Sequence, residues 1–138
     1  MINMIPLLHE ELTRRIIGCA MRVHSELKSG FQEIIYQRSL EIELRLNGIS
    51  FESEREMSIF YRKEMVGKRR VDFLIEKIIV VEIKAVSKLE DVHIAQALNY
   101  LECMNLQVGL LINFGSTSLE FKRIHNNKFI GGQIKNQA

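Results

Sequence analysis

The segment IIVVEIKAV, Ile78 to Val86, is the most informative part of the chain for predicting its fold and its candidate site. Its run of apolar and β-branched residues is typical of a strand buried in a sheet. Glu82 and Lys84 interrupt this pattern two positions apart, so both side chains lie on the same face of the strand. Because burying charge is costly, the pair needs either compensating partners or a function.

The tripeptide pattern E-x-K is weak by itself, and the chain contains it three times, at 26–28, 82–84 and 120–122. The first falls at an expected helix end and the third in a half-exposed strand, where solvated charges are ordinary. Only the middle one breaks an apolar strand. It also has Asp72, one of two aspartates in the chain, on the strand just before it. A pair of salt bridges at a strand end remains the alternative interpretation of these three residues.

Length and composition indicate one globular domain over residues 1–138, with 46% hydrophobic and 26% charged residues. The net charge of +2 means that affinity for an anionic polymer must come from a local patch. The two cysteines, Cys19 and Cys103, are too few for a structural zinc or iron–sulfur site. With no signal segment or membrane span recognisable, we expect a cytoplasmic protein without a membrane partner or small-molecule cofactor.

Hydrophobic periodicity divides the chain into eight elements. Helices are expected at about 8–27 and 31–46, the second ended by Asn47-Gly48, and at about 88–104, opened by a Ser87/Glu90 capping box. Strands are expected within 49–62, 68–75, 78–86, 108–114 and 119–124, with turns at 65–67 and 76–77. The core is expected over about 12–124, and the polar tail 126–138 is expected to fray or to form an arm.

The resulting order, α-α-β-β-β-α-β-β, predicts an α/β fold with a mixed sheet flanked by helices. A helical crossover lets the strand at 108–114 add parallel to the strand at 78–86. The two carboxylates can meet only in one register. A two-residue loop at 76–77 would send Asp72 and Glu82 to opposite faces, so we predict an odd-length loop that pairs Ile75 with Ile79 and sets Asp72 opposite Glu82.

Two carboxylates beside a lysine have a coherent chemical use. Oxygen ligands from Asp72 and Glu82 suit Mg²⁺ or Mn²⁺. Such an ion lowers the pKa of a bound water and neutralises charge that builds on a phosphate. Lys84 can orient that water and stabilise the pentavalent intermediate.

These residues resemble the PD-(D/E)XK nuclease superfamily. Within it, the segment GFQEIIY, with Gly30, Glu33 and Tyr36, is similar to the motif of the GxxExxY proteins. Gln96 and Tyr100, one helical turn apart, resemble the QxxxY motif of the RecB-type branch. The resemblance extends from about Leu12 to Ile124. One departure is Val71, which stands where the superfamily's name has proline.

The resemblance implies a restriction-endonuclease-like fold and hydrolysis of nucleic acid, leaving a 5′-phosphate. It implies that Glu33, Asp72, Glu82 and the backbone carbonyl of Ile83 bind Mg²⁺ or Mn²⁺, and that Lys84 is catalytic. Gln96 would orient the catalytic groups, and Tyr100 would contact the nucleic acid.

Several of these residues also have structural explanations. Glu33 near a helix start is favoured by the helix dipole without any metal. Tyr36 is better explained as a packing residue with a tethered hydroxyl than as a catalyst. His93 is expected to be structural. For Gln96 a functional role is the favoured interpretation, because a glutamine side chain that faces the sheet needs a hydrogen-bond partner.

A basic cluster around one expected hairpin could hold a phosphate backbone, although a solvated turn is the default explanation; its members are Arg62, Lys63, Lys68, Arg69 and Arg70. No tryptophan and no stripe of interleaved aromatic and basic residues is present, so base stacking is not indicated. We expect a metal-dependent nuclease, acting on DNA in repair, processing or defence and able to form homo-oligomers. A non-catalytic nucleic-acid-binding or assembly module, and a module that binds metal only for stability, remain alternatives.

Overall fold

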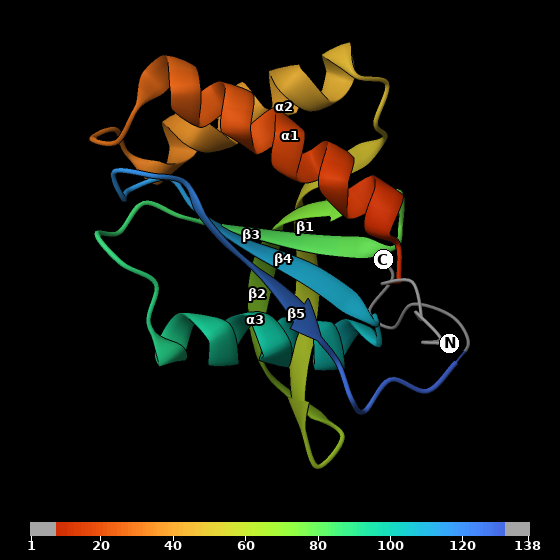
Figure 1. Cartoon of the computed structure of the whole chain (residues 1–138). Coiled ribbons are helices and arrows are strands. Elements are labelled where there is room, and N and C mark those ends of the chain that lie inside the picture. Colours follow the sequence, from red (N-terminus) through yellow and green to blue (C-terminus); the bar gives the residue numbers. More distant parts are fainter. Residues whose placement is uncertain (1–7, 132–138) are drawn as a thin grey trace, which may run out of the picture.

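The structure is a computed structural model that describes residues 8–131. One five-stranded sheet lies between two helical layers (Figure 1). The helices α1 (Glu10–Leu27) and α2 (Glu33–Leu46) cover one face, and α3 (Asp91–Met104) covers the other. Among residues 8–131, no helix combines the length and apolar character that crossing a lipid bilayer requires.

The sheet has the order β1-β2-β3-β4-β5. Its strands are β1 (Phe51–Tyr61), β2 (Glu64–Ile75), β3 (Ile79–Lys84), β4 (Val108–Asn113) and β5 (Glu120–His125). β3 and β4 run parallel and are joined through α3, whereas the other neighbouring pairs are antiparallel. The predicted order of elements and the mixed sheet are therefore confirmed.

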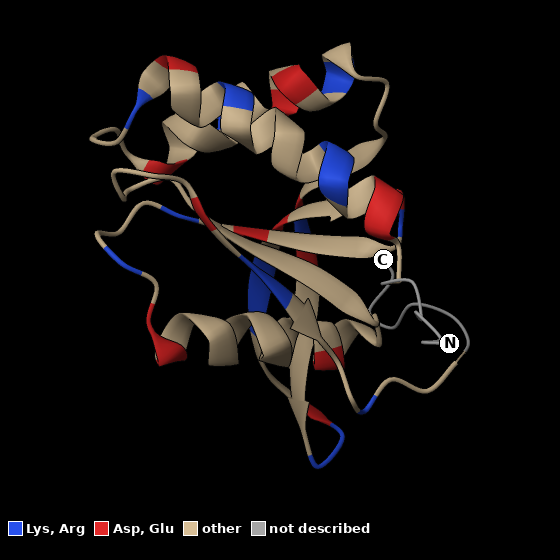
Figure 2. Cartoon of the chain, viewed as in Figure 1, with Lys and Arg blue, Asp and Glu red and all other residues tan. Residues whose placement is uncertain are grey.

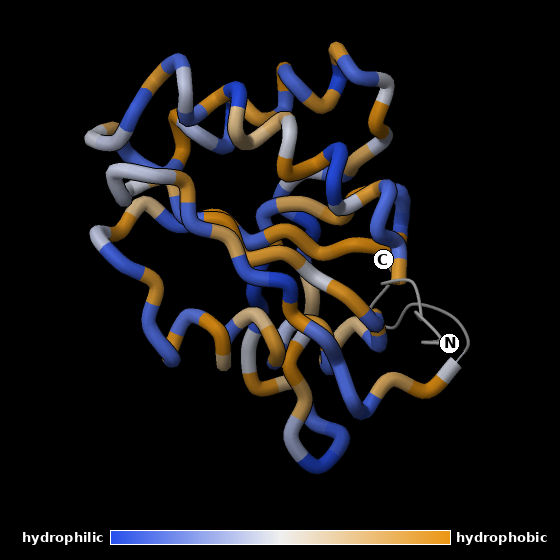
Figure 3. Tube along the Cα trace, viewed as in Figure 1, coloured by the Kyte–Doolittle hydropathy of each residue, from blue (hydrophilic) through white to orange (hydrophobic). Residues whose placement is uncertain are grey.

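Each face of the sheet has its own apolar core, because β3 and β4 are buried on both sides. Val81 and Ile83 pack toward the α1–α2 layer, and Val80 packs toward α3. Figure 3 shows the two strands as a hydrophobic band through the centre of the molecule. Burial on both faces explains why the segment at 78–83 lacks the polar–apolar alternation of a surface strand.

The β1–β2 hairpin turns earlier than predicted. Tyr61 pairs with Glu64, and Arg62 and Lys63 both have left-handed backbone conformations, as a tight two-residue hairpin loop requires. The prediction of a turn at 65–67 is therefore wrong: these residues belong to β2. Val66 is the additional residue at a β-bulge, because the register shifts where Ile59 pairs with Gly67 and Phe60 with Met65.

The start of α3 also differs from the prediction. Glu90, rather than Ser87, is the N-cap, and its side chain accepts a hydrogen bond from the backbone of His93. The Nδ1 atom of His93 in turn accepts from the N–H of Glu90 at 2.9 Å. His93 thus completes a capping box in the position usually held by Glu or Gln, which is why the sequence pattern missed it.

Part of the expected fraying tail is held in place. The Nδ2 atom of Asn126 donates to the carbonyl of Leu106 at 3.0 Å, and Asn126 is buried. Asn105 exchanges two hydrogen bonds with the backbone of Ile130. Residues 126–131 are therefore fastened to the α3–β4 connection, and residues 132–138 lie outside the described part of the chain.

The segment that follows β3 is locked to the end of β4. Asn113 is fully buried, and its side chain bonds both the N–H and the carbonyl of Val86, each at 2.9 Å. A Cβ atom on Gly115 would overlap the backbone of Ala85 and Val86. This close packing fixes the chain immediately after Lys84.

We predict that Gly115→Ala lowers the free energy of unfolding by about 1–3 kcal/mol or more, because the backbone around Val86 must move to admit the methyl group. Urea denaturation of the two proteins measures the difference. Gly18→Ala is the control: its Cβ meets Arg22 only at ordinary contact distance, so this helical substitution should stabilise slightly. Equal effects of the two substitutions would contradict the proposed packing constraint.

Candidate active site

The connection between β2 and β3 sets the register of the site. Ile75 pairs with Ile79, and Phe73 pairs with Val81. The loop therefore has the odd length that was predicted, and continuing the same register sets Asp72 opposite Glu82. The predicted register is confirmed.

At this point, side chains replace the backbone ladder between the two strands. The N–H of Asp72 donates to Oε1 of Glu82 at 3.0 Å, and the N–H of Ile83 donates to Oδ2 of Asp72 at 2.7 Å. Each acid thus holds one oxygen on the neighbouring strand. Asp72 is half-buried and Glu82 is 5% exposed, so the pair lies at the margin of the core.

Both carboxyl groups resist ionisation. Burial raises the pKa of Asp72 to about 6 and that of Glu82 to about 8. For Glu82, the charge of Asp72 raises the pKa further, whereas the hydrogen bond from the N–H of Asp72 and the charge of Lys84 oppose the shift. The two sites titrate as a pair, because each carboxylate affects the other. The structure therefore holds like charges close together.

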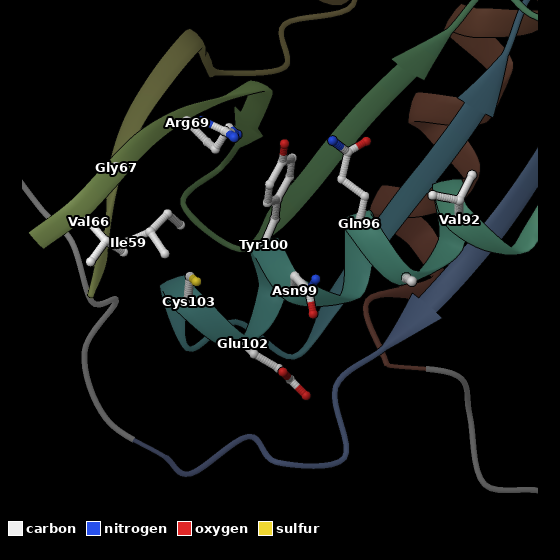
Figure 4. A pocket seen from close by; sticks show the side chains of 11 residues that line it. Ile59, Val66, Gly67, Arg69, Val92, Gln96, Asn99, Tyr100, Glu102 and Cys103 are labelled. Atoms are coloured by element: carbon white, nitrogen blue, oxygen red, sulfur yellow. The ribbon is translucent and has the colours of Figure 1, made fainter. Parts of the chain in front are cut away.

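Lys84 and α3 close the site on one side of the sheet. The Nζ atom of Lys84 donates to Oε1 of Gln96 at 3.1 Å. Tyr100 lies on the same side of α3, one turn further along (Figure 4). Burial raises the pKa of Tyr100, and the charges of Glu82 and Asp72 add to the shift, so the phenol lies within electrostatic reach of both acids. The structure thus brings together Asp72, Glu82, Lys84, Gln96 and Tyr100.

The segment GFQEIIY delivers Glu33 to the rim of this site. Gly30 has φ +121°, a conformation that side chains disfavour, and Tyr36 ties down the same loop. The hydroxyl of Tyr36 donates to the carbonyl of Lys28 and accepts from the N–H of Phe31, and its ring stacks on Phe114 at 4.8 Å. Tyr36 is thus a packing residue with a tethered hydroxyl, as predicted.

Glu33 is the first residue of α2 and is exposed. Its charge raises the pKa values of Asp72 and Glu82, so it lies near enough for its charge to be felt by both acids. Within residues 8–131, however, no three Asp, Glu, His or Cys side chains form a ready-made metal-binding group. Glu33 therefore faces the site from its edge and does not join the two strand acids directly.

Sequence reasoning missed Glu54. Its charge raises the pKa of Asp72, and its backbone has φ +53°, where the β1–β2 pairing skips from Ser53–Phe73 to Arg55–Val71. The strand is irregular here: Val71 and Phe73 pack in opposite cores although two positions apart. No sequence signal marked this site, because glutamate rarely adopts a left-handed conformation.

The basic residues of β2 lie on opposite faces of the strand. Arg69 lines a groove beside Tyr100, and its charge lowers the pKa of that phenol. Lys68 and Arg70 alternate with Arg69 and therefore point to the other face of the hairpin, where Lys68 pairs with Glu56 at 3.4 Å. Figure 2 shows basic residues along β2 and at the hairpin tip. Of the three predicted nucleic-acid contacts on β2, only Arg69 is placed beside the candidate site.

Comparison with known proteins decides the family. A sequence profile described as the PD-(D/E)XK nuclease superfamily matches residues 10–124, which include every candidate site residue. The chain belongs to this superfamily. No match supports the finer assignments, so similarity to the GxxExxY proteins and to the RecB-type branch stays a prediction.

A solved structure titled "Crystal structure of SSO0001" has the same fold, with a TM-score of 0.55 and 22% sequence identity. The alignment covers 86% of this chain and 59% of that chain, so the present chain spans less than two thirds of the length of its structural relative. No curated protein matched the sequence significantly. This structural similarity concerns the fold alone.

The donor set of this PD-(D/E)XK domain fits a divalent cation. Magnesium is typically held by one or two carboxylates and keeps several waters. Asp72 and Glu82 each keep a second carboxylate oxygen outside these two hydrogen bonds, and the neighbouring carbonyl of Ile83 is a further candidate ligand. A cation would also offset the repulsion that raises both pKa values.

We predict that, in EDTA, the free energy of unfolding falls as the pH rises from about 5 to about 8. In the unfolded chain the two carboxyls ionise near pH 4. In the folded chain their pKa values are about 6 and about 8, so the folded state binds more protons over this range and loses stability as they leave. Urea titrations at several pH values measure the slope.

Asp72→Asn and Glu82→Gln should each flatten this slope, whereas Asp91→Asn should leave it unchanged, because Asp91 is exposed at the start of α3. Adding Mg²⁺ should stabilise the protein more at pH 8 than at pH 5, since only ionised carboxylates bind the ion. Stability that rises with pH in EDTA would contradict the raised pKa values.

Proposed function

We propose that this protein is a metal-dependent nuclease that hydrolyses phosphodiester bonds, with DNA as the substrate. The observation that carries the proposal is the meeting of Asp72 and Glu82 across β2 and β3, with Lys84 near enough for its charge to act on both acids. A structural ion pair does not explain this arrangement, because the Nζ atom of Lys84 bonds the amide of Gln96 and neither carboxylate forms a salt bridge among the described residues.

In this proposal, Asp72, Glu82 and the carbonyl of Ile83 hold Mg²⁺ or Mn²⁺, and Glu33 contributes from the rim. A bound ion supplies a water of lowered pKa and neutralises charge on the phosphate. Water attacks phosphorus, the bond to the 3′ oxygen breaks, and the products carry a 5′-phosphate and a 3′-hydroxyl. The attacking water gives up one proton to solvent, and the leaving 3′ oxygen takes one up from solvent.

The chain's own residues orient these groups. Lys84 can donate from Nζ to the attacking water or to a phosphate oxygen, and Gln96 holds that ammonium through its Oε1 atom. The lock between Asn113 and Val86 fixes the backbone just beyond Lys84. Arg69 and Tyr100 are suited to contact the phosphate backbone, and Lys68 and Arg70 to add longer-range attraction from the other face.

The pathway is proposed as repair, processing or defence, in the cytoplasm. Neither cysteine is in a disulfide, which fits a reducing compartment. Self-association stays a prediction. A non-catalytic module that binds nucleic acid within an assembly is the second candidate; it is favoured by the absence, within residues 8–131, of a ready-made group of three metal-ligating side chains.

We predict that Lys84→Ala lowers kcat/KM for cleavage of labelled DNA by about 10²-fold or more, while binding persists, because the substitution removes a group that acts in the transition state. Mg²⁺ and Mn²⁺ should each be tested, with DNA and RNA substrates.

Lys122→Ala is the matched control, since Lys122 ends another E-x-K tripeptide and is exposed on β5, two strands from β3. It should retain wild-type activity, and this comparison also excludes a contaminating nuclease. Cleavage that survives in Lys84→Ala would refute the catalytic assignment. Binding without cleavage by the wild type would favour the non-catalytic module.

A further inference from the structure

A groove of about 580 Å³ runs between the β1–β2 hairpin and α3, directly beside the candidate active site. The hairpin contributes Ile59, Gly67 and Arg69, and the helix contributes Gln96, Asn99 and Tyr100 (Figure 4). Gln96 and Tyr100 belong to both places, because Gln96 accepts a hydrogen bond from Lys84 and the charge of Glu82 acts on the phenol of Tyr100. Whatever occupies the groove therefore lies next to the reacting phosphate.

The lining of the groove combines apolar walls with a few polar groups. Ile59 and Cys103 lie within it, and Val66 and Val92 stand at its rims with 64% and 67% of their surface exposed. Asn99 adds an exposed amide that can both donate and accept. The groove thus offers surface for a flat apolar ring and hydrogen-bonding groups for its edge.

The positive charge in the groove suits the phosphate end of one nucleotide. The guanidinium of Arg69 lies near Tyr100, whose pKa it lowers, and so stands at the side of the active site. The acidic member of the lining, Glu102, is paired with Lys128 at 3.5 Å. A run of several phosphates would need more cationic side chains than Arg69 alone, whereas one base with a single phosphate matches the lining.

We propose that this groove binds one unpaired nucleobase of the substrate, next to the phosphate that is cleaved. The inference rests on the proposed nuclease function and specifies its substrate: single-stranded DNA, or a flap or frayed end. A base in a duplex is stacked and paired, and taking it out costs a few kcal/mol. The sequence has no aromatic stripe and therefore did not indicate base stacking, whereas the groove is formed by residues far apart in sequence.

Gly67 gives a direct means of closing the groove. Its φ lies outside the left-handed region, and a Cβ atom there would meet no atom within 4 Å, so the backbone does not require glycine. Gly67 pairs with Ile59, and both line the groove, so a side chain at position 67 would fill it. Leucine is preferable to an aromatic residue, which could itself stack on a base.

The test measures binding of a short fluorescein-labelled single-stranded DNA by anisotropy, with Mg²⁺ and in the Lys84→Ala background so that no cleavage occurs. Gly67→Leu should weaken binding roughly tenfold, which is the effect expected from losing one stacked base. Gly131→Leu is the control, because its Cβ would also meet open space and Gly131 does not line the groove.

A series of oligonucleotides with one abasic site each completes the test. One abasic position should weaken binding by a similar factor in the parent, and should have little further effect in Gly67→Leu, since both changes remove the same contact. Additive losses would overturn the proposal, as would equal affinity of Gly67→Leu and the parent for every oligonucleotide.

Alkylation of the groove provides a measurement that needs no substitution. In the wild-type chain, Cys19 is fully buried and Cys103 is half-buried within the groove, so N-ethylmaleimide should label Cys103. Saturating single-stranded DNA should protect Cys103, and duplex DNA of the same sequence should protect it less. Equal labelling of Cys103 with and without bound single strand would overturn the proposal even if Gly67→Leu does not fold.

The outcomes separate this inference from the proposed function. Groove-dependent binding by a protein that does not cleave would refute the nuclease proposal and support the base site. Cleavage that is insensitive to Gly67→Leu and to every abasic position would refute the base site and leave the nuclease proposal standing.

Discussion

The exchange of hydrogen bonds between Asp72 and Glu82 is the constraint on which the rest of the site depends. Where the β2–β3 ladder would continue, each carboxylate uses one oxygen to bond the neighbouring backbone. The bonds fix both side chains without any cation, and each acid keeps a second oxygen outside this exchange. A pair of acids arranged in this way is preorganised for a ligand, because the side chains lose their conformational entropy on folding and not on binding.

The surrounding elements can be understood by how they support this pair. The double burial of β3 makes its register rigid, and a slip of one residue would bury the acids in the opposite core. On one side, Tyr36 and Gly30 fix the loop that brings Glu33 to the rim. On the other side, Gln96 holds Lys84. The apolar packing that stabilises the fold and the polar contacts that shape the site thus act on the same short strand.

Much of this could be predicted from the sequence, because the informative signals were local. The apolar run at 78–81 identified the central strand, and the requirement that two acids share a face fixed the loop length. The spacing of Gln96 and Tyr100 indicated one face of a helix. The hairpin tip could not be predicted, because two non-glycine residues, Arg62 and Lys63, adopt left-handed conformations there. Residues 126–131 were misjudged because a polar composition does not reveal hydrogen bonds to Asn105.

The groove and Glu54 show a different limit of sequence reasoning. Both depend on how the long hairpin curls past α3, which Figure 1 shows and which no local pattern encodes. The interruption of pairing at Glu54 lies beside Asp72, so this irregularity and the acid pair occur at the same row of the sheet. Val71 and Leu74 pack in the same core on the side of α3, although three positions separate them. One irregularity in β1 and β2 therefore shapes both the chemistry at the row of acids and the groove beside it.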